Sequence, residues 1–266
     1  MTTLAELALE RLQHPPARTQ DQREFSSDLS IEELAAIGAA GFEPRGLVGG
    51  TCVFRVGWQF VGWTQAAEVE TLSQAMYASR ERAMRRLCQE AARVGGDGVV
   101  GVRLDIEFEH WGEGLGEFTA IGTAVRHRER PGSFRTPVGD VFSSDLSGQD
   151  LWTLLRSGYR PLGMVMGCCV YHYPAQGLSG WMQNLSQNVE LEGLTRAFYT
   201  ARELAMERMQ KEASSLGAEG VVGVRAEEKS HVWGGHTLEF LAIGTAVRAY
   251  SGSTSEPVSM VRRLDA

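Results

Sequence analysis

Three short motifs occur twice in this 266-residue chain, and they constrain its fold more than any other feature. GVVGVR stands at 98–103 and 220–225, and AIGTAVR at 120–126 and 242–248, so both recur 122 residues apart. FSSDLS stands at 25–30 and 142–147, only 117 residues apart, which gives the second copy five additional residues between these motifs. Motifs that recur at nearly constant spacing indicate a tandem duplication. The sequence therefore predicts two copies of one folded unit.

The boundaries of the two copies follow from the motifs. We expect an N-terminal tail (1–24), a first repeat (25–128), a linker (129–141), a second repeat (142–250) and a C-terminal tail (251–266). The linker region contains two prolines and two glycines and has no apolar periodicity. Tails of this kind are usually disordered, and the alternative is that one of them is a docking peptide for a protein partner.

Each copy predicts the same order of elements. Ser30-x-x-Glu33 has the form of a capping box, which predicts a short helix over 31–40 that stops at Gly41. A strand is expected over 44–54, then a long amphipathic helix ended by Gly95, then a β-hairpin of strands 99–109 and 117–127. The predicted fold class is α+β, with each repeat a small antiparallel sheet packed on one long helix and preceded by a short helix.

The second strand of the hairpin is apolar on both faces, which is typical of a strand that is covered on both sides. Ile121 and Val125 point one way, and small or apolar residues point the other way. Ile243 and Val247 repeat this pattern in the second copy. One long helix covers only one face of a sheet, so the sister repeat, another subunit or a ligand must cover the other. We therefore predict assembly, with these four residues at an interface.

GVVGVR followed by AIGTAVR, after a long helix that ends in Gly, resembles the YbjQ family, also called the putative heavy-metal-binding domain family. The resemblance covers 46–126 and 163–248. It implies a dodecin-like subunit that assembles into rings, typically pentamers. The tandem arrangement and the FSSDLS-led preface depart from the family pattern. Five chains of this kind would supply ten domains.

The family's description directs attention to the cysteines and histidines. Cys168-Cys169-x-x-His172 is the best cluster, because thiolates and imidazoles suit soft metals, and Cys52 aligns with Cys169. In an extended strand Cys168 and His172 lie about 13 Å apart, so a site would need ligands from a neighbouring strand or subunit. Buried structural thiols are the favoured interpretation. Sequestration of a heavy-metal ion, or binding of a flavin-like ligand between subunits, is the alternative.

Two further pairs of residues match across the copies and are candidate interface residues. Arg103 and Arg225 occupy the same place in GVVGVR, and Trp111 corresponds to Trp233. Arg and Trp are both common at the centres of interfaces. The arginines are expected to form structural ion pairs rather than to act in catalysis.

Composition excludes several classes of function. The net charge of −7 argues against a nucleic-acid partner, and no apolar stretch is long enough to span a membrane. The N-terminus has no features of a secretory signal, so we expect a cytoplasmic protein. GxSxG, Walker A and HExxH motifs are all absent from the sequence. The prediction is a non-enzymatic, ring-forming homo-oligomer.

Overall fold

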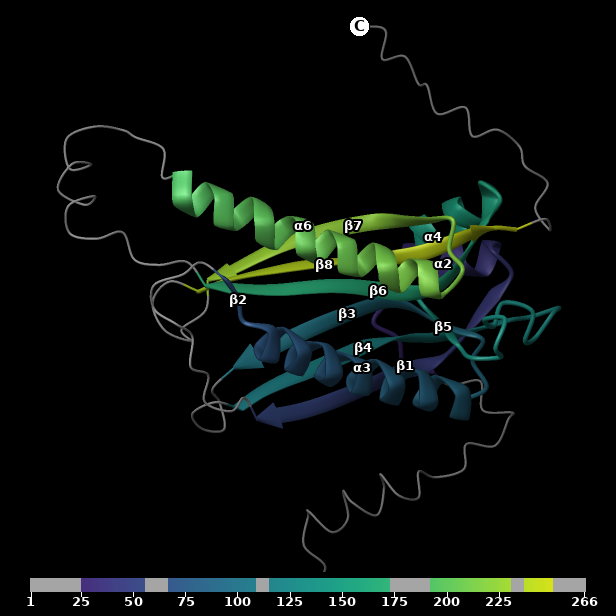
Figure 1. The fold of residues 1–266 in the computed structure, drawn as a ribbon. Coiled ribbons are helices and arrows are strands. Elements are labelled where there is room, and N and C mark those ends of the chain that lie inside the picture. Colours follow the sequence, from purple (N-terminus) through teal and green to yellow (C-terminus); the bar gives the residue numbers. More distant parts are fainter. Residues whose placement is uncertain (1–24, 56–66, 109–114, 173–191, 231–236, 251–266) are drawn as a thin grey trace, which may run out of the picture.

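A computed structural model describes residues 25–55, 67–108, 115–172, 192–230 and 237–250 (Figure 1). The first repeat contains α2 (Ile31–Ala39), β1 (Phe42–Arg55), β2 (Ala67–Glu68), α3 (Glu70–Arg93), β3 (Gly98–Phe108) and β4 (Leu115–His127). The second contains β5 (Phe142–Ser143), α4 (Gly148–Arg156), β6 (Tyr159–His172), α6 (Glu192–Ser215), β7 (Gly220–Ser230) and β8 (Thr237–Ala249). The fold is α+β, as predicted.

Local sequence signals explain where the helices begin and end. Ser30 and Glu33 form both hydrogen bonds of a capping box at α2, and Ser147 caps α4 through the N–H of Asp150. The glycine after α2, Gly41, has φ of 87°, a conformation that L side chains rarely adopt. Glycines with positive φ also end the two long helices. The predicted stops are therefore confirmed.

The eight strands among the described residues form two four-stranded, mainly antiparallel sheets, one for each repeat. Their strand orders are β1-β4-β3-β5 and β2-β6-β8-β7. The two shortest strands cross over between the repeats. β5, from the second repeat, pairs in parallel with β3 of the first, and β2, from the first, pairs with β6 of the second. Each repeat therefore completes the sheet of the other.

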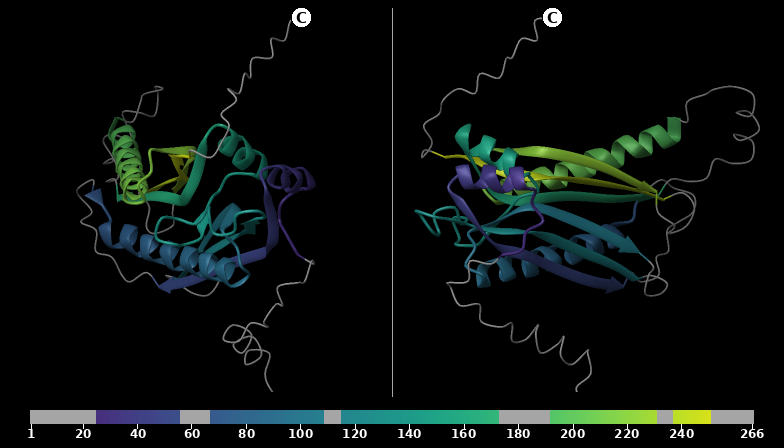
Figure 2. Two further views of the ribbon diagram at one scale, coloured as in Figure 1. Left: turned by 90° about the vertical axis from the view of Figure 1, so that its right-hand side faces the viewer. Right: turned by 180° about the vertical axis from the view of Figure 1, so that it is seen from behind.

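Each long helix covers one face of its own sheet (Figure 1). Gly50 in β1 allows this close approach, because a Cβ there would lie 2.1 Å from the Ala83 carbonyl oxygen of α3. Gly167 in β6 serves α6 in the same way. The helices α2 and α4 pack against each other at one end of the molecule, which is visible when the ribbon is seen from behind (Figure 2).

The strict alternation predicted for the first strand of the hairpin holds only beyond a bulge. The register of β3 against β4 shifts between Val100 and Arg103, and Gly101 within the bulge has φ of 66°. Val99 and Val100 are both fully buried as a result, whereas residues 102–106 keep the period of two. Gly223 marks the same bulge in β7. Within the described residues, no helix is long and apolar enough to cross a membrane.

Candidate assembly interface

The two repeats meet where α3 of the first lies against β6 of the second. The Tyr77 hydroxyl donates a hydrogen bond of 2.7 Å to the Met166 carbonyl, and the Val170 N–H donates one of 3.1 Å to the Ser73 hydroxyl. Burial, aided by the charge of Glu212, raises the pKa of Tyr77 to about 12, so the hydroxyl remains a donor at neutral pH. Side chains of one repeat thus satisfy backbone groups on a strand edge of the other.

Two ion pairs of opposite polarity join the repeats at this contact. Arg80 lies 2.5 Å from Glu212, and its side chain is only 4% exposed. Arg208 donates to both carboxylate oxygens of Glu68, at 2.5 and 2.7 Å. Burial of Glu68 opposes its ionisation, but the hydrogen bonds and charge of Arg208 outweigh burial and lower the pKa of that carboxyl. The first repeat supplies the cation of one pair and the anion of the other.

The second-repeat members of these pairs are positioned by the backbone of β6. Glu212 accepts a 3.1 Å hydrogen bond from the Met166 N–H with its second oxygen. Arg208 donates to the Cys168 carbonyl at 2.7 Å. Both side chains are thereby held facing the first repeat.

We call the contact between the two repeats the joint. Its apolar part comes from the face of the second sheet that α6 does not cover. These side chains belong to the same hydrophobic cluster as the core of the first repeat, and each is at most 4% exposed. They are Met164, Met166, Cys168, Val170, Leu241 and Ile243.

At the other end of the joint, the start of the second repeat extends the first sheet. The Phe142 N–H donates to the Asp97 carbonyl at 3.2 Å, and the Ser144 N–H donates to the Val99 carbonyl at 2.9 Å. The Phe142 ring is fully buried over Gly98, where an added Cβ would lie 2.0 Å from it. Only glycine leaves room for this ring.

The first repeat carries the same positioned pair on its own outer strand, β1. Glu90 of α3 accepts a 2.7 Å hydrogen bond from the Gly49 N–H, and Arg86 donates to the Thr51 carbonyl. These two side chains correspond in sequence to Glu212 and Arg208. The half of the joint made by a glutamate and an arginine of the long helix beside the outer strand is therefore present twice, and among the described residues only the copy in the second repeat is engaged.

The sheet face on β6 and β8, which is covered in the joint, and the equivalent face on β1 and β4 of the first repeat differ in exposure. Leu47, Val53 and Ile121 are 41%, 55% and 38% exposed, and the residues at these positions of the second repeat are at most 4% exposed. Three exposed apolar side chains lie on one sheet face of the first repeat, all at positions that are buried in the other copy. Among the described residues, this face of the first repeat is therefore unpartnered.

The second repeat has an open face of its own, on α6 and β7, which corresponds to the α3 and β3 side of the joint. Tyr199 is 55% exposed, and Val224 is 42% exposed, whereas its counterpart Val102 is 1% exposed. Arg202 is exposed, whereas Arg80 at the same position of α3 is buried. Side chains of α6, β7 and β8 border a groove of about 660 Å³ at this face.

The predicted apolar interface residues lie in different surroundings. Ile243 is buried in the joint, and Ile121 lies on the open face of the first repeat. Val125 is buried in a cluster with Phe142 of the second repeat, and Val247 is buried near α4. A role for these four residues between subunits stays a prediction.

The predicted interface arginines form ion pairs within their own repeats. Arg103 lies 2.7 Å from Asp28, and Arg225 lies 3.2 Å from Asp145. Each acid belongs to the FSSDLS motif of the same repeat, so the pairs fasten that motif to the sheet. Trp111 and Trp233 lie outside the described residues.

The candidate metal ligands do not converge. Cys168 faces the joint, Cys169 faces the core beneath α6, and Cys52 is buried in the core of the first repeat. Burial raises the pKa of Cys168 well above its ordinary value and that of Cys169 to about 12, which disfavours the thiolate that a metal would need. His172 is also buried. Among the described residues, no group of three or more His, Cys, Asp or Glu side chains could hold a metal ion.

Heavy-metal binding through these residues therefore stays a prediction, and it would need a ligand set that these contacts do not supply. Binding of a flavin-like ligand between subunits also stays a prediction.

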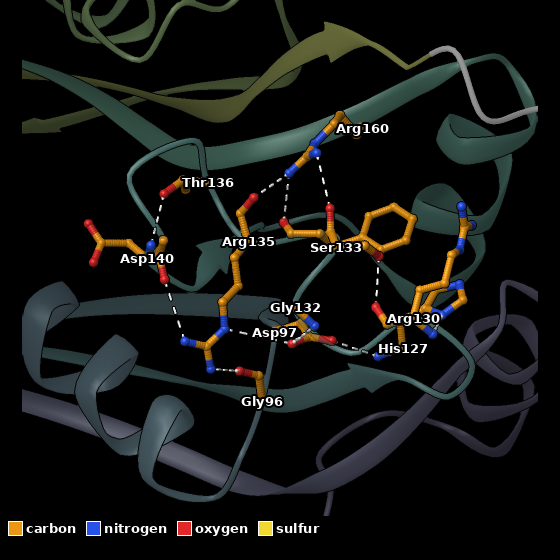
Figure 3. Close-up of polar contacts among 12 residues, drawn as sticks. Gly96, Asp97, His127, Arg130, Gly132, Ser133, Arg135, Thr136, Asp140 and Arg160 are labelled. Carbon is orange, nitrogen blue, oxygen red and sulfur yellow. Dashed lines mark hydrogen bonds and ion pairs between the residues drawn. The ribbon is translucent and has the colours of Figure 1, made fainter.

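The predicted linker is fixed to both repeats around one buried carboxylate (Figure 3). Asp97, 2% exposed, accepts hydrogen bonds from the N–H groups of His127 (2.9 Å) and Gly132 (2.8 Å), and lies 3.7 Å from Arg135. Arg160 of the second repeat donates to three carbonyls of residues 133–135, at 2.6 to 3.2 Å. The linker thus holds the two repeats in one relative orientation.

Sequence reasoning identified the face that needs a cover but did not assign the polar residues of the joint. Tyr77 and Arg80 match Tyr199 and Arg202 across the copies, but a match between copies does not say what these side chains contact. One feature of the sequence could have indicated these residues. A tyrosine and an arginine are identical in both copies of the long helix, although the core-facing side of that helix needs only apolar residues.

Comparison with known proteins agrees with the duplicated architecture. The family model of YbjQ, described as putative heavy-metal-binding, matches residues 51–128 and again residues 159–250. The chain belongs to the YbjQ family. Its two FSSDLS motifs, together with α2 and α4, lie outside the matched regions.

Relatives of this YbjQ-family chain include a protein of its own length. The chain is 48% identical over 267 residues to the encapsulin nanocompartment protein Rv1762c of Mycobacterium tuberculosis, covering 99% of this chain and 98% of that protein. A UPF0145 protein of Halorubrum lacusprofundi is 40% identical over 88 residues, covering 33% of this chain and 82% of that protein. A UPF0145 protein of Thermotoga maritima is 44% identical over 59 residues, covering 22% of this chain and 54% of that protein.

Proposed function

We propose that this protein is a non-enzymatic, cytoplasmic assembly protein whose copies join head to tail by repeating the joint between its own two repeats. One observation carries the proposal. The polar residues that α3 and α6 bring to the joint occur in both repeats, and among the described residues each repeat has engaged one half of this set and left the other half exposed. In the joint, α3 and β3 cover the face on β6 and β8. The open face on α6 and β7 of a second copy would cover the equivalent open face on β1 and β4.

The contacts between copies follow from the contacts within the chain. Arg202 of one copy would pair with Glu90 of the next, as Arg80 pairs with Glu212. The hydroxyl of Tyr199 would donate to the carbonyl of Gly49. Leu47, Val53 and Ile121 would be covered by the neighbouring α6 and β7, as their counterparts are covered by α3 and β3.

Such an interface is heterologous, because two different surfaces meet. Heterologous interfaces form a ring when the rotation between copies closes, and an open filament when it does not. The chain contains two repeats, so any closed ring holds an even number of them. A pentamer of this chain, the stoichiometry that the family resemblance implies, would hold ten repeats.

The test compares matched charge reversals at one helix. Native mass spectrometry of the wild-type protein at micromolar concentration should give the mass of an oligomer of two or more chains. Arg202→Glu places like charges at the joint and should weaken assembly at least about 100-fold. Arg196→Glu is the control, since Arg196 is also exposed on α6 and its counterpart Gln74 stays exposed beside the in-chain joint.

Restoring opposite charges provides the stringent arm of this experiment. Glu90→Arg combined with Arg202→Glu should recover part of the assembly that Arg202→Glu loses. A wild-type chain that remains monomeric at micromolar concentration would refute the proposed function. An Arg202→Glu variant that assembles as tightly as the Arg196→Glu control would refute this placement of the joint.

A second proposal comes from similarity along the whole chain rather than from the interface. The relative from M. tuberculosis is named as an encapsulin nanocompartment protein, and it aligns with 99% of this chain. We propose that the assembly associates with such a compartment. Co-expression with an encapsulin shell protein followed by co-sedimentation tests this, and sedimentation of the protein apart from the shell would contradict it.

A further inference from the structure

The outer edge of β7 is the unoccupied counterpart of an edge that is occupied in the first repeat. In the first sheet, β5 covers the edge of β3 by pairing Phe142 with Gly98 and Ser143 with Val99. In the second sheet, β7 is the terminal strand, and no strand pairs with its outer edge among the described residues. An open strand edge is a template for the addition of another strand.

The segment that could occupy this edge is the start of the first FSSDLS motif, which is hydrogen-bonded to its own sheet. The hydroxyl of Ser27 lies 2.9 Å from that of Thr123, and Asp28 accepts a 2.7 Å hydrogen bond from Thr123. Ser144 and Asp145 make the same contacts with Thr245 in the second repeat, at 3.0 and 2.6 Å. Both FSSDLS motifs are therefore anchored to their own sheets in the same way.

The two residues that precede each anchor have different surroundings. Phe142 is fully buried against the repeat before it, whereas Phe25 is 45% exposed. Ser143 is also buried, and Ser26 is exposed. Among the described residues no repeat covers Phe25 as the first repeat covers Phe142, so a second copy of the chain is the candidate partner for this ring.

We propose that Phe25 and Ser26 of one copy add to the outer edge of β7 in a second copy as a short parallel strand, with the Phe25 ring over Gly220. The proposal rests on the proposed head-to-tail assembly and adds to it a contact in which one side, Phe25 and Ser26, lies outside the family-matched regions. By register, Phe25 pairs with Gly220 and Ser26 with Val221, as Phe142 and Ser143 pair with Gly98 and Val99.

The site on β7 has the required shape. A Cβ at Gly98 would lie 2.0 Å from the Phe142 ring, but a Cβ at Gly220 would meet only Val247, at 3.9 Å. The space beside Gly220 is therefore open in the single chain. Gly223 has φ of 65°, nearly the 66° of Gly101, so the backbone of the two edges bends in the same way.

Two variants that act on opposite sides of this contact test the proposal. Phe25→Ala removes the ring, and Gly220→Leu fills the space that the ring would occupy without straining the single chain. Each should weaken self-association at least about tenfold, measured by analytical ultracentrifugation across a dilution series, with an unchanged unfolding midpoint for the dilute chain. Combined, they should weaken it no more than either does alone, because both remove one contact.

A disulfide between molecules tests the register directly. Under oxidising conditions, a mixture of Ser26→Cys and Val221→Cys chains should form a cross-linked dimer that neither variant forms alone. Ser26→Cys mixed with Glu228→Cys is the control, since Glu228 lies seven residues along β7, about 23 Å in an extended strand.

The outcomes separate this proposal from the one on which it rests. If the wild-type chain assembles, but Phe25→Ala and Gly220→Leu assemble as tightly and no specific cross-link forms, strand addition is overturned and head-to-tail assembly stands. If the wild-type chain is monomeric, the head-to-tail assembly itself fails.

Discussion

Arg80 and Arg202 occupy the same position in the two repeats, yet replacing them should have opposite consequences. Arg80→Met should lower the free energy of unfolding of the dilute chain by about 2 to 3 kcal/mol. Arg202→Met should leave it within about 0.5 kcal/mol of wild type, as is usual for an exposed residue, and should weaken self-association instead.

The magnitude follows from the burial of the in-chain ion pair. The Arg80 side chain is 4% exposed and that of Glu212 is 26% exposed. Removing one member of a fully buried pair costs about 3 to 5 kcal/mol, because the other charge is left without compensation. Glu212 would keep its hydrogen bond from the Met166 N–H and part of its hydration, so the cost falls below that range. Methionine retains most of the apolar volume of the arginine stem.

The assay is urea unfolding followed by circular dichroism, at a protein concentration below that of assembly. A double-mutant cycle with Glu212→Gln isolates the coupling between the two charges from other effects of each substitution. Sedimentation at higher concentration then measures association of the same variants. Equal losses of unfolding free energy for Arg80→Met and Arg202→Met would refute the reasoning, since they would mean that the two positions have the same environment in the single chain.

Three further predictions concern the joint, the thiols and the linker. Because the pKa of Glu68 is lowered from its ordinary value of 4.5, its contribution to stability is present above pH 4.5 and is lost as the pH falls through the lowered pKa. The difference in urea midpoint between wild type and Glu68→Gln should therefore shrink between pH 7 and pH 3.5, and a constant difference would contradict this. Cys168 and Cys169 should not react with a thiol reagent at pH 8 in the folded chain and should react fully in denaturant, because burial raises both pKa values. Asp97→Ala should lower the free energy of unfolding by about 2 to 4 kcal/mol by leaving buried N–H donors unsatisfied, and limited proteolysis should then cut within 129–141.

Much of the fold follows from the sequence because its signals are local. Ser30 and Glu33 identify the start of α2, Gly95 identifies the end of α3, and the repeated motifs align the two hairpins. The need for a cover over one sheet face also follows, since a strand that is apolar on both sides cannot leave one side in water. These inferences depend only on periodicity, capping and duplication.

The exchanged strands could not be predicted, because β2 and β5 contain only two residues each. Such short strands have no periodicity, and they form because a neighbouring edge is available. The solvent exposure of matching residues could not be predicted from the sequence either. Val102 and Val224 stand at the same position of the same motif, yet they are 1% and 42% exposed, because a second repeat covers only the first of them.

The joint proposed between copies differs in composition from the joint within the chain. Where β6 and β8 contribute Met166, Cys168 and Leu241, the first repeat has Gly49, Thr51 and Thr119. Thr51 and Thr119 hydroxyls lie 3.1 Å apart, so this part of the open face is polar and already internally hydrogen-bonded. A face that remains in water between encounters must be less apolar than one that is covered from the moment of folding.

The residue types of the Arg80–Glu212 pair and of Tyr77, in contrast, recur at the proposed joint. In the proposed assembly, direction and register would therefore depend on the same residue types in each joint, and binding strength on the apolar residues that differ. In the proposed assembly, duplication would fix one joint by covalent connection and leave the other governed by concentration. A ring built this way would dissociate between chains while each chain stays folded.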